Sequence, residues 1–524
     1  MFVRAKGKEP YRYLQIVENH REGRRTVQRV LCTLGRVDEL RTSGATDALL
    51  RSLVRFGQQV QLVEGYQSGQ LEAGTIRQLG PDLVFGRLWQ SMGVQTILSE
   101  LLRERRFEFS VERAVYLTVL HRLFESGSDR AAERWRRDVH IPGSGELELH
   151  HLYRAMHWLG EVKDQVEEAL FARRRDLFTD LTLAFFDTTS IYFEGEGGES
   201  LGQHGHSKDH RPDLKQLVMG VVLTGEGRPV CCEVWAGNQS DVRSLLPVVD
   251  RLRERFGIKR VCWVADRGMI SGETIRELED RGLEYILGAR MRRQNEVREV
   301  VLGDPGTYEK VADNLEVKEV MVEARRYVVC HNESEAEKDA ADRKAIVNAL
   351  GDQLKNGGKS LVGNRGYQRF LKLERGAMSI DEAKVKAEER FDGKFVLRTN
   401  TTLASGEVAL QYKRLQMVEQ FFRAMKSVLE TRPIFHQWDM TIKGHVFCSF
   451  LGLVLADELQ RRVRAKGWQE EWDVIRRDLE VLAEVEVRQG DEWYLLRTSL
   501  VGVAGKVLQA AGVAVPPPIR AVLH

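Results

Sequence analysis

Cysteine is scarce in this sequence, and its spacing carries no motif. The 524 residues include six cysteines, at positions 32, 231, 232, 262, 330 and 448, and no Cys-x-x-Cys pair. A disulfide framework would need a denser and more regular pattern. The composition therefore predicts a reduced, intracellular protein.

Long apolar runs and a secretion signal are also missing. The longest apolar run, 446–456, is about half of the roughly 20 residues that span a bilayer, so we expect a buried helix there. The first ten residues contain no apolar stretch typical of a secretion signal. These absences predict a cytoplasmic protein with no membrane segment.

Net charge is small as well. The total is +2 although 30% of the residues are charged, so it does not by itself indicate a nucleic-acid binder. Residues 1–41 contain ten Lys/Arg and five acidic residues, a local excess that could meet phosphates. A solvated surface hairpin explains that excess equally well.

The sequence is long enough for several domains, and its first two regions differ in pattern. Runs rich in β-branched and aromatic residues at 11–17 and 26–34 predict a β-hairpin within region 1–42. Apolar spacing predicts helices throughout region 43–178. A DNA-binding helix-turn-helix could lie in this second region, but an ordinary helical bundle fits the same spacing and is favoured.

From residue 179 the pattern alternates between strands and helices. This alternation has the order of a ribonuclease-H-like core, which is a mixed sheet flanked by helices. The expected elements are a strand at 181–186, a hairpin at 216–223 and 230–235, a helix at 241–256, a strand at 260–265, a helix after Ser271 and a strand at 284–287.

A charged segment without tryptophan interrupts this core. We expect the core to occupy 179–290 and 411–465, with an α+β insertion at 291–410. The C-terminal region, 466–524, is predicted to be mainly helical, with a short strand pair around 484–496, and to contribute to dimerisation. The predicted fold class is therefore α/β.

Three acidic residues stand where a two-metal site would need them. Asp187 and Asp266 each end an apolar strand-like run, and the two strands should be neighbours in the sheet. Glu419 lies on an amphipathic helix that begins at Tyr412 and should pack on the same sheet. Adjacent carboxylates cost free energy unless a cation neutralises them, and oxygen ligands favour Mg²⁺ or Mn²⁺ over zinc. Two such ions could hold a phosphodiester for cleavage and rejoining.

Each of these residues taken alone has a simpler interpretation. An aspartate after a strand can start a turn by bonding its own downstream backbone. Glu419 could be part of the charged margin of any amphipathic helix. The combination of all three favours the metal site.

The histidine-rich segment that follows the first strand offers a competing motif. Residues 204–210 (HGHSKDH) differ by one extra residue from the His-x-His-x-Asp-His zinc motif of metallo-β-lactamase-like hydrolases. The extra residue puts the last two ligands out of register, so zinc is disfavoured. Phosphate binding and a plain surface loop remain equally supported for the three basic residues of this region: Lys208, Arg211 and Lys215.

Together these segments resemble the DDE transposases of bacterial insertion sequences, in the group with a Tyr-x₂-Arg-x₃-Glu-x₆-Lys (YREK) signature. The resemblance covers 180–300 and 395–455 well. It implies that Asp187, Asp266 and Glu419 form the catalytic triad and bind two Mg²⁺ or Mn²⁺ ions per active site. The segments that carry it are FFDTTS (185–190), GHSKDHRPDLKQ (205–216), GNQSD (237–241), VADRGM (264–269) and Tyr412 through Lys426.

The resemblance also implies which residues contact DNA. Tyr412 and Lys426 match signature positions associated with DNA contact. Leu415 stands where the signature has arginine, so Arg414 or Arg423 could replace that contact.

The insertion departs from the family pattern in one respect. The insertion in this family often carries a Trp that packs on a flipped base, and this chain has none between 291 and 410. Tyr308, Tyr327 or Tyr367 could stack instead. Whether a DNA hairpin forms during excision therefore stays open.

The implied function is metal-dependent cleavage at insertion-sequence ends followed by strand transfer into target DNA. The implied partners are double-stranded DNA, with its terminal inverted repeats and target, and a second copy of the chain in a synaptic homodimer. The implied location is the bacterial cytoplasm, at the nucleoid. A ribonuclease-H-like nuclease that only hydrolyses DNA and a non-catalytic, transposase-derived DNA-binding protein are the alternatives.

Overall fold

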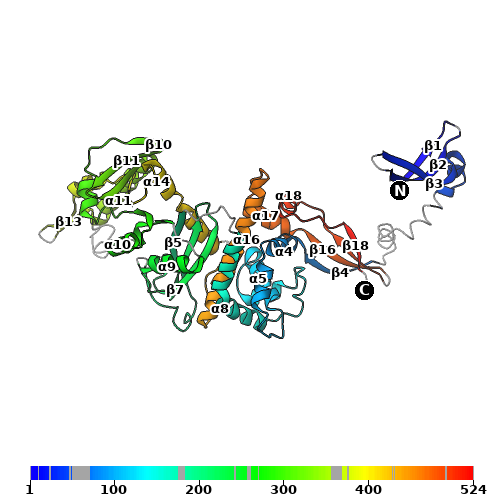
Figure 1. The fold of residues 1–524 in the computed structure, drawn as a ribbon, viewed down its shortest axis with the longest axis horizontal. Helices are drawn as coiled ribbons and strands as arrows, with labels where there is room; N and C mark the ends of the chain where they lie inside the picture. The colour runs from blue at the N-terminus through cyan, green and yellow to red at the C-terminus, as the bar shows by residue number, and fades with distance from the viewer. Residues whose placement is uncertain are drawn as a thin grey trace. The chain divides into compact units, whose positions relative to one another are not determined.

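Figure 1 shows the computed structural model of the chain, which divides into two compact units. Unit 1 comprises 1–80, 472–508 and 514–524, and unit 2 comprises 81–471 and 509–513. The structure describes residues 2–9, 11–22, 25–46, 49, 71–174, 183–240, 243–256, 261–269, 271–355, 369–374, 377–427, 429, 431–489 and 492–522. Tyr367, and the first residues of the elements predicted at 181–186, 241–256 and 260–265, lie outside these ranges.

Unit 1 contains two antiparallel sheets. The first has the order β1-β2-β3 and confirms the predicted hairpin, with one more strand before it. Its strands are β1 (Phe2–Lys6), β2 (Tyr13–Glu22) and β3 (Arg25–Arg36), followed by α1 (Val37–Thr42). The second has the order β18-β17-β16-β4 and consists of β4 (Leu71–Gln78), β16 (Ala483–Gln489), β17 (Glu492–Arg497) and β18 (Ile519–Val522).

The second sheet corrects the helical prediction for region 43–178 and confirms the strand pair expected around 484–496, to which it adds β18. Strand β4 lies inside region 43–178, which the apolar spacing had assigned to helices. Three strands lie in region 466–524, beside the helices α17 (Trp472–Glu480) and α18 (Ala504–Ala511). The β4 strand depends on pairing between Ile76 and Val485, far apart in the chain. The hydrophobic periodicity of one segment does not indicate which distant strand pairs with it.

The centre of unit 2 is a nine-stranded mixed sheet, in the order β10-β11-β12-β15-β9-β8-β5-β6-β7. Within it, β5 is antiparallel to β6 and parallel to β8, which is parallel to β9. The α/β class and the mixed sheet are therefore confirmed. The core strands are β5 (Leu183–Tyr192), β6 (Gln216–Thr224), β7 (Pro229–Ala236), β8 (Cys262–Ala265) and β9 (Glu284–Gly288).

Strands from the predicted insertion extend this same sheet. β15 (Lys394–Thr399) pairs with β9 and so joins β10 (Glu309–Ala312), β11 (Leu315–Val322) and β12 (Arg325–His331) to the core. A separate small apolar core forms around Leu350 and Phe370. The insertion also contains the π-helix Glu296–Val301. Its other helices and strands are α11 (Glu333–Lys355), β13 (Leu371–Glu374), β14 (Ala377–Ile380) and α13 (Glu382–Glu389).

Helices pack on the core strands. α9 (Leu245–Phe256) and α10 (Gly272–Asp280) form one apolar core with inward residues of the sheet such as Phe186 and Ala265. Ser271 caps α10 by accepting a bond from the Thr274 amide, as the sequence predicts. α14 (Ser405–Lys413) packs on β8 and β9, and α15 (Gln416–Ser427) packs on β5 and β6.

The helix predicted to run on from Tyr412 is in fact two helices. α14 ends at Lys413 and α15 begins at Gln416, with a tight turn in which the Leu415 amide bonds the Tyr412 carbonyl. Tyr412 therefore does not share one helical side with Glu419 and Lys426. A continuous apolar stripe cannot distinguish one long helix from two short ones that meet at a corner.

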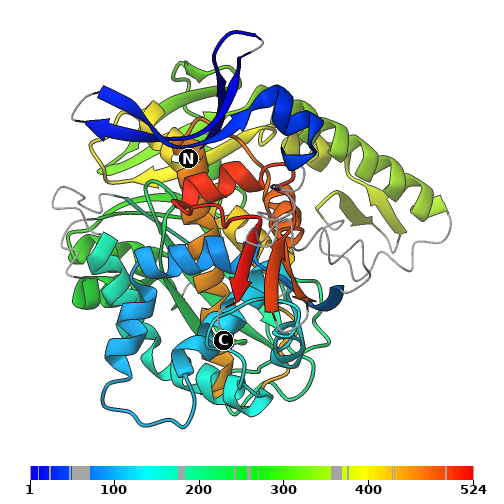
Figure 2. The ribbon, with the colours of Figure 1, turned by 90° about the vertical axis from the view of Figure 1, so that its right-hand side faces the viewer.

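The helical part of unit 2 is built around α16 (Asp439–Ala465), which packs along α8 (Leu149–Arg174) (Figure 2). By length and composition α16 could cross a membrane, but 78% of its most apolar window is buried, so the predicted buried helix is confirmed. The other helices here are α4 (Gly80–Ser91), α5 (Val94–Leu101), α6 (Val111–Phe124) and α7 (Asp129–Trp135).

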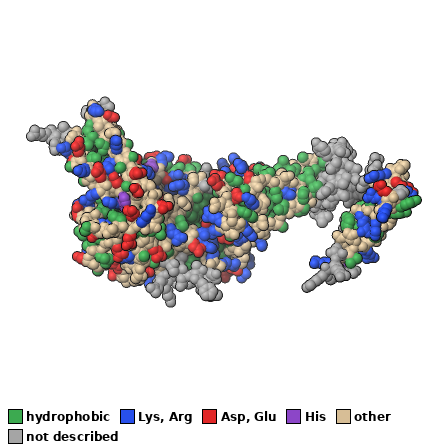
Figure 3. All heavy atoms as spheres, turned by 90° about the horizontal axis from the view of Figure 1, so that it is seen from above, with side chains coloured by type: hydrophobic (Ala, Val, Ile, Leu, Met, Phe, Trp, Pro, Cys, Tyr) green, Lys and Arg blue, Asp and Glu red, His purple; other side chains and the backbone are tan. Residues whose placement is uncertain are grey.

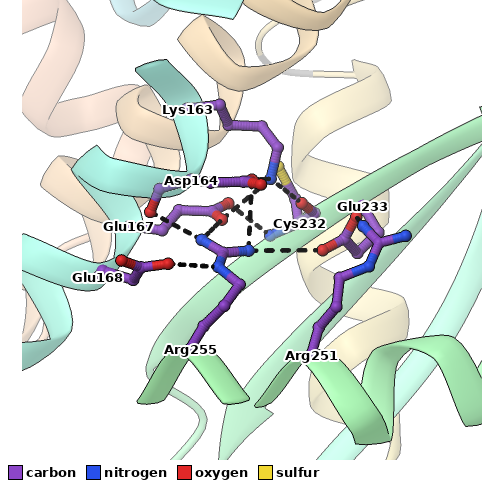
Figure 4. A network of polar contacts seen from close by, with 8 residues as sticks. All are labelled: Lys163, Asp164, Glu167, Glu168, Cys232, Glu233, Arg251 and Arg255. Atoms are coloured by element: carbon purple, nitrogen blue, oxygen red, sulfur yellow. Dashed lines mark hydrogen bonds and ion pairs between the residues drawn. The ribbon is translucent and has the colours of Figure 1, made fainter. Parts of the chain in front are cut away.

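A buried ionic network joins α8 to the edge of the sheet (Figure 4). Glu167 of α8, whose side chain is fully buried, accepts bonds from Lys163 and from the Cys232 amide of β7. Arg255 of α9 bonds the same carboxylate at 3.1 Å. Each of these buried charges has a partner of opposite charge, which offsets the cost of removing it from water, and the network links α8 and α9 to β7.

Candidate active site

Asp187 and Asp266 follow equivalent positions on two neighbouring parallel strands. Phe186 of β5 pairs with Ala265 of β8, and each aspartate is the next residue. Phe186 and Ala265 both face the core beneath α9 and α10. Because side chains alternate along a strand, both aspartates belong to the opposite face.

One detail of the sequence prediction is wrong for Asp187. The residue does not end its strand, since β5 continues to Tyr192. Pairing with β6 persists from Asp187 through Tyr192, whereas the parallel partner β8 stops at Ala265. Asp187 therefore begins the part of β5 that is paired with β6 alone.

Lys208 is a basic residue beside Asp187. Its Nζ lies 3.9 Å from Asp187 Oδ1 and donates to the Thr188 carbonyl at 2.8 Å. The Thr188 amide donates to Asp187 Oδ1 at 2.7 Å. The carboxylate is only 18% exposed, so its position is set by these neighbours.

Asp266 accepts a hydrogen bond from Tyr412, one of the residues predicted to contact DNA. The Tyr412 hydroxyl donates to Asp266 Oδ1 at 3.0 Å. Burial, and after it the Asp266 charge, raises the pKa of Tyr412, so the hydroxyl stays protonated and remains a donor at neutral pH. Gly288 makes this approach feasible because a Cβ there would lie 2.5 Å from the Tyr412 oxygen.

Glu419 is exposed in the first turn of α15, and Val418 and Phe422 beside it are buried. The helix packs on β5 and β6, so Glu419 approaches the sheet that carries Asp187. Among the described residues, however, the three carboxylates do not bring one oxygen each to within 4.8 Å of one another. The structure thus places Asp187 and Asp266 directly after paired residues of two parallel strands, and leaves Glu419 on a neighbouring helix.

Lys426 is paired with an acidic residue of the histidine-rich segment. Its Nζ lies 2.7 Å from Asp209 Oδ1, and Arg432 Nη1 lies 2.6 Å from the same oxygen. Burial lowers the pKa of Lys426. Neither Asp209 nor any other ligand of 204–210 belongs to a three-residue metal cluster among the described residues, so the zinc alternative gains no support.

The remaining basic candidates lie at the surface. Arg211 pairs with Asp213, and Lys215 pairs with Glu196. Two others, on either side of the α14–α15 corner, are exposed: Arg414 and Arg423. On the face shown in Figure 3, basic and acidic side chains are interspersed, in keeping with the small net charge.

Sequence reasoning missed Arg432 and the partners of Asp209 and Tyr412. Arg432 and Arg211 each place a guanidinium 5.6 Å from the Tyr192 ring, near the end of β5. A signal was available, since Asp209 and Lys426 both belong to segments that carried the resemblance. Only the fold shows that these segments meet.

A second cluster, Asp129, His436 and His445, brings three potential ligand atoms within 4.8 Å of one another. Arg122 lies among them, with Nη2 2.8 Å from His445 Nδ1 and 3.5 Å from Asp129 Oδ1. Burial, and after it Arg122, lowers the pKa of His445. Because a guanidinium keeps its charge, it already supplies the cation here, and the cluster does not fit a metal.

The pair at the sheet fits a divalent metal better. Two carboxylates on adjacent strands offer hard oxygen ligands, and bringing them together costs free energy that a cation offsets. The chemistry of these donors matches Mg²⁺ or Mn²⁺.

Comparison with known families bears on this arrangement. A family model described as the transposase DDE domain matches residues 179–432. A model described as the IS1634 family transposase N-terminal domain matches residues 2–68. These matches support an insertion-sequence DDE transposase. Such a domain implies DNA binding and the use of a divalent metal.

Other comparisons add little. No curated protein matches the sequence. A cryo-EM structure of a piggyBac transposase synaptic complex with hairpin DNA is similar at 10% identity and a TM-score of 0.37, over 77% of this chain and 78% of that chain. A similarity at this level carries no argument about the present chain.

Proposed function

We propose that this protein cuts DNA at the ends of its own insertion sequence and joins those ends to target DNA, as a member of the YREK-signature group. The observation that carries the proposal is the placement of Asp187 and Asp266 on adjacent parallel strands, within the segment that matches the DDE domain. Glu419 is proposed as the third carboxylate, contributed by α15.

In this proposal, Asp187, Asp266 and Glu419 hold two Mg²⁺ or Mn²⁺ ions per active site. Such ions would polarise the phosphodiester and activate the attacking oxygen. Tyr412 keeps Asp266 oriented through its hydroxyl, and Lys208 places a positive charge beside Asp187. Alignment of Glu419 with the other two carboxylates would accompany DNA binding.

The proposed chemistry has two displacement steps at one site. Water attacks the phosphorus at the element end, the bond to the 3′ oxygen breaks, and a 3′-hydroxyl and a 5′-phosphate result. That hydroxyl then attacks a target phosphodiester and releases a target 3′-hydroxyl. The second step makes one bond and breaks one, so it needs no nucleotide energy source.

DNA contacts in this proposal come from residues that surround the carboxylates. Lys208 lies beside Asp187 and Lys426 pairs with Asp209, whereas Arg211, Lys215, Arg414 and Arg423 would contact the backbone further out. Exposed Arg414, at the α14–α15 corner, or exposed Arg423, further along α15, would replace the signature arginine at Leu415. Phosphate contacts of this kind position DNA without reading its sequence.

The proposed assembly is a homodimer that holds both terminal inverted repeats in one synaptic complex, because the two ends must be cut together. The proposed location is the bacterial cytoplasm, at the nucleoid. In this proposal, regions outside the catalytic core recognise the sequences of the element ends.

The test is a reaction with a donor DNA that carries the terminal repeats flanking the gene, in Mg²⁺ and in Mn²⁺. We expect cleaved ends and joined products, both of which are abolished by EDTA. Asp187→Asn, Asp266→Asn and Glu419→Gln should each lower both products at least a hundredfold, with repeat binding retained.

Matched controls remove exposed carboxylates nearby. Asp280→Asn on α10 and Glu407→Gln on α14 should cut and join at the normal rate. Cleavage without any joined product would identify a hydrolytic nuclease instead. Binding without cleavage in either metal would identify a non-catalytic DNA-binding protein, and normal cutting by Glu419→Gln would refute its assignment.

A further inference from the structure

Asp209 is a buried carboxylate outside the proposed set of metal ligands. Its side chain is only 5% exposed, and its Oδ1 accepts a hydrogen bond from Lys426 Nζ at 2.7 Å. Arg432 Nη1 lies 2.6 Å from the same oxygen. Lys426 belongs to the last turn of α15, and Arg432 to the segment that follows this helix. Because a buried charge is costly to leave unpaired, the two cations hold their part of the chain on Asp209.

The segment that carries Asp209 is attached to β5. The amide of Lys208, its neighbour, donates to Ser190 Oγ at 2.8 Å, and Lys208 Nζ donates to the Thr188 carbonyl at 2.8 Å. The same Nζ lies 3.9 Å from Asp187 Oδ1. Two consecutive residues therefore contact a proposed metal ligand on the strand and the end of the helix that carries another.

The segment after α15 is attached to the same strand. The Glu194 amide donates to the Ile434 carbonyl at 3.2 Å, and the Ile434 amide donates to the Tyr192 carbonyl at 3.4 Å. The Arg432 guanidinium lies 5.6 Å from the Tyr192 ring. The C-terminal end of α15 is thus tied to β5 in two places, through Asp209 and through residues 432–434.

Glu419 and Lys426 are seven residues apart on α15. Seven residues make almost two turns, so the two side chains leave the helix within about 20° of the same side, about 10 Å apart along its axis. The bond from Lys426 to Asp209 therefore fixes the rotation of α15 about its own axis. It also sets the side from which Glu419 emerges.

We propose that Asp209 is a positioning residue for Glu419. By binding Lys426 and Arg432 it holds α15 on β5, in the rotation that lets the Glu419 carboxylate join Asp187 at a metal ion. This inference rests on the proposed function, and Asp209 itself contacts neither the metal nor DNA. Because the helix end is fixed, the alignment that accompanies DNA binding is a movement of the Glu419 side chain and not of the whole helix.

The experiment measures Mn²⁺ binding by the full chain. The chain is saturated with a terminal-repeat duplex that ends at the cleavage point, so that no bond is left to cut. Unbound Mn²⁺ is followed by electron paramagnetic resonance. Asp209→Asn, which keeps the size of the side chain, should raise the dissociation constant of the weaker bound ion about tenfold, because Glu419 is no longer held in place.

Two further variants show whether Asp209 acts through Glu419. Glu419→Gln should raise the same dissociation constant at least as much, and adding Asp209→Asn to it should raise the constant by less than about twofold more. Lys426→Gln breaks the pair from the helix and should match Asp209→Asn. It keeps the test decisive if Asp209→Asn does not fold.

Asp392→Asn is the matched control for a role in stability alone. Asp392 pairs with Arg343 in the insertion, and the two side chains are 16% and 13% exposed. Loss of either buried pair should lower the urea midpoint. Only Asp209→Asn should also weaken Mn²⁺ binding and slow end cleavage, whereas Asp392→Asn should leave both unchanged.

The outcomes separate the positioning role from the proposed function. If Asp209→Asn and Lys426→Gln bind Mn²⁺ normally while Glu419→Gln does not, the positioning role is wrong and the proposed function stands. A full additional loss in the double variant would also overturn the positioning role, because Asp209 would then act elsewhere. Mn²⁺ binding that is unaffected by Glu419→Gln would refute the proposed site, and this inference with it.

Discussion

At the scale of single residues, Asp266 depends on its partners. The Tyr412 hydroxyl reaches Asp266 only because Gly288 leaves space for it. A hydrogen bond to a charged group contributes about 1.5–3 kcal/mol and also fixes the direction of the carboxylate lone pairs. Tyr412 is thus a positioning residue for Asp266 in the proposed site.

Tyr412→Phe should lower the rate of end cleavage about tenfold, because Asp266 loses the donor that orients it. The measurement is the single-turnover cleavage rate, with repeat binding assayed in parallel. Tyr327→Phe is the control, since it removes a comparable bond from a Tyr hydroxyl to a carboxylate, Glu296, within the insertion. Equal rate losses in both variants would show that Tyr412 acts only through stability.

His121 on α6 predicts how stability depends on pH. Burial, and after it Arg122, lowers its pKa from about 6.5 to about 3. Between these values the unfolded chain binds a proton that the folded chain does not, so the free energy of unfolding falls as pH falls below about 6.5. The slope from this one group is about 1.4 kcal/mol per pH unit.

Urea unfolding at pH 7.0 and 5.0 checks this expectation. His121→Leu should lose about 2 kcal/mol less than the unmodified chain over that interval, because it removes the titrating group from the buried site. An unchanged slope in His121→Leu would contradict the assignment.

At the scale of elements, the contact between α8 and α16 depends on two glycines. A Cβ at Gly160 would lie 2.0 Å from the Met440 carbonyl oxygen, and one at Gly444 would lie 1.8 Å from that of Met156. The two backbones therefore meet directly at this crossing. This contact, together with the ionic network of Glu167 and Arg255, holds the helical part of unit 2 in place beside the sheet.

Gly444→Ala should destabilise unit 2 by at least about 1–3 kcal/mol, since the added methyl group forces the helices apart. Gly452→Ala on the same helix is the control. Its Cβ would meet Leu429 and Leu123 side chains at 3.5 Å or more, an ordinary contact. The measurement is the urea midpoint of each variant, and a tolerated Gly444→Ala would contradict the close crossing.

At the scale of the whole molecule, core and insertion share one sheet. β15 pairs with both β9 and β12, so the inserted strands continue the hydrogen-bond ladder of the core. The helices and two short strands between β12 and β15 have their own apolar core around Leu350. The insertion is thus an extension of the sheet with a smaller lobe attached.

The smaller lobe should therefore be removable without loss of the sheet. His331 and Lys394 face each other at the ends of antiparallel β12 and β15, so replacing 332–393 with Asn-Gly should close a two-residue hairpin. We expect a folded protein with cooperative unfolding, less stable by about 3–5 kcal/mol because buried Phe391 is lost. Circular dichroism and urea unfolding measure this.

Deletion of 394–399 is the contrasting variant. It removes β15, separates β12 from β9 and leaves two unpaired strand edges, so it should aggregate or unfold. If both variants behave alike, the lobe and the sheet are one cooperative structure.

The sequence alone determined the chain order of the core elements and the two aspartates that follow apolar runs. Strand and helix periodicity, with caps such as Ser271, report local burial, and local burial is encoded in consecutive residues. The hairpin at 216–224 and 229–236 can be predicted from the sequence for the same reason. The DDE domain match at 179–432 agrees with that interpretation of the core.

Only the tertiary structure decided which distant groups meet. The pairing of β4 with β16, the bond from Tyr412 to Asp266 and the corner at Leu415 each depend on packing between segments far apart in the chain. Local pattern carries no record of such partners. The pocket lined by Tyr153, Phe435 and Trp438 arises the same way, since its walls come from segments that are far apart in the sequence.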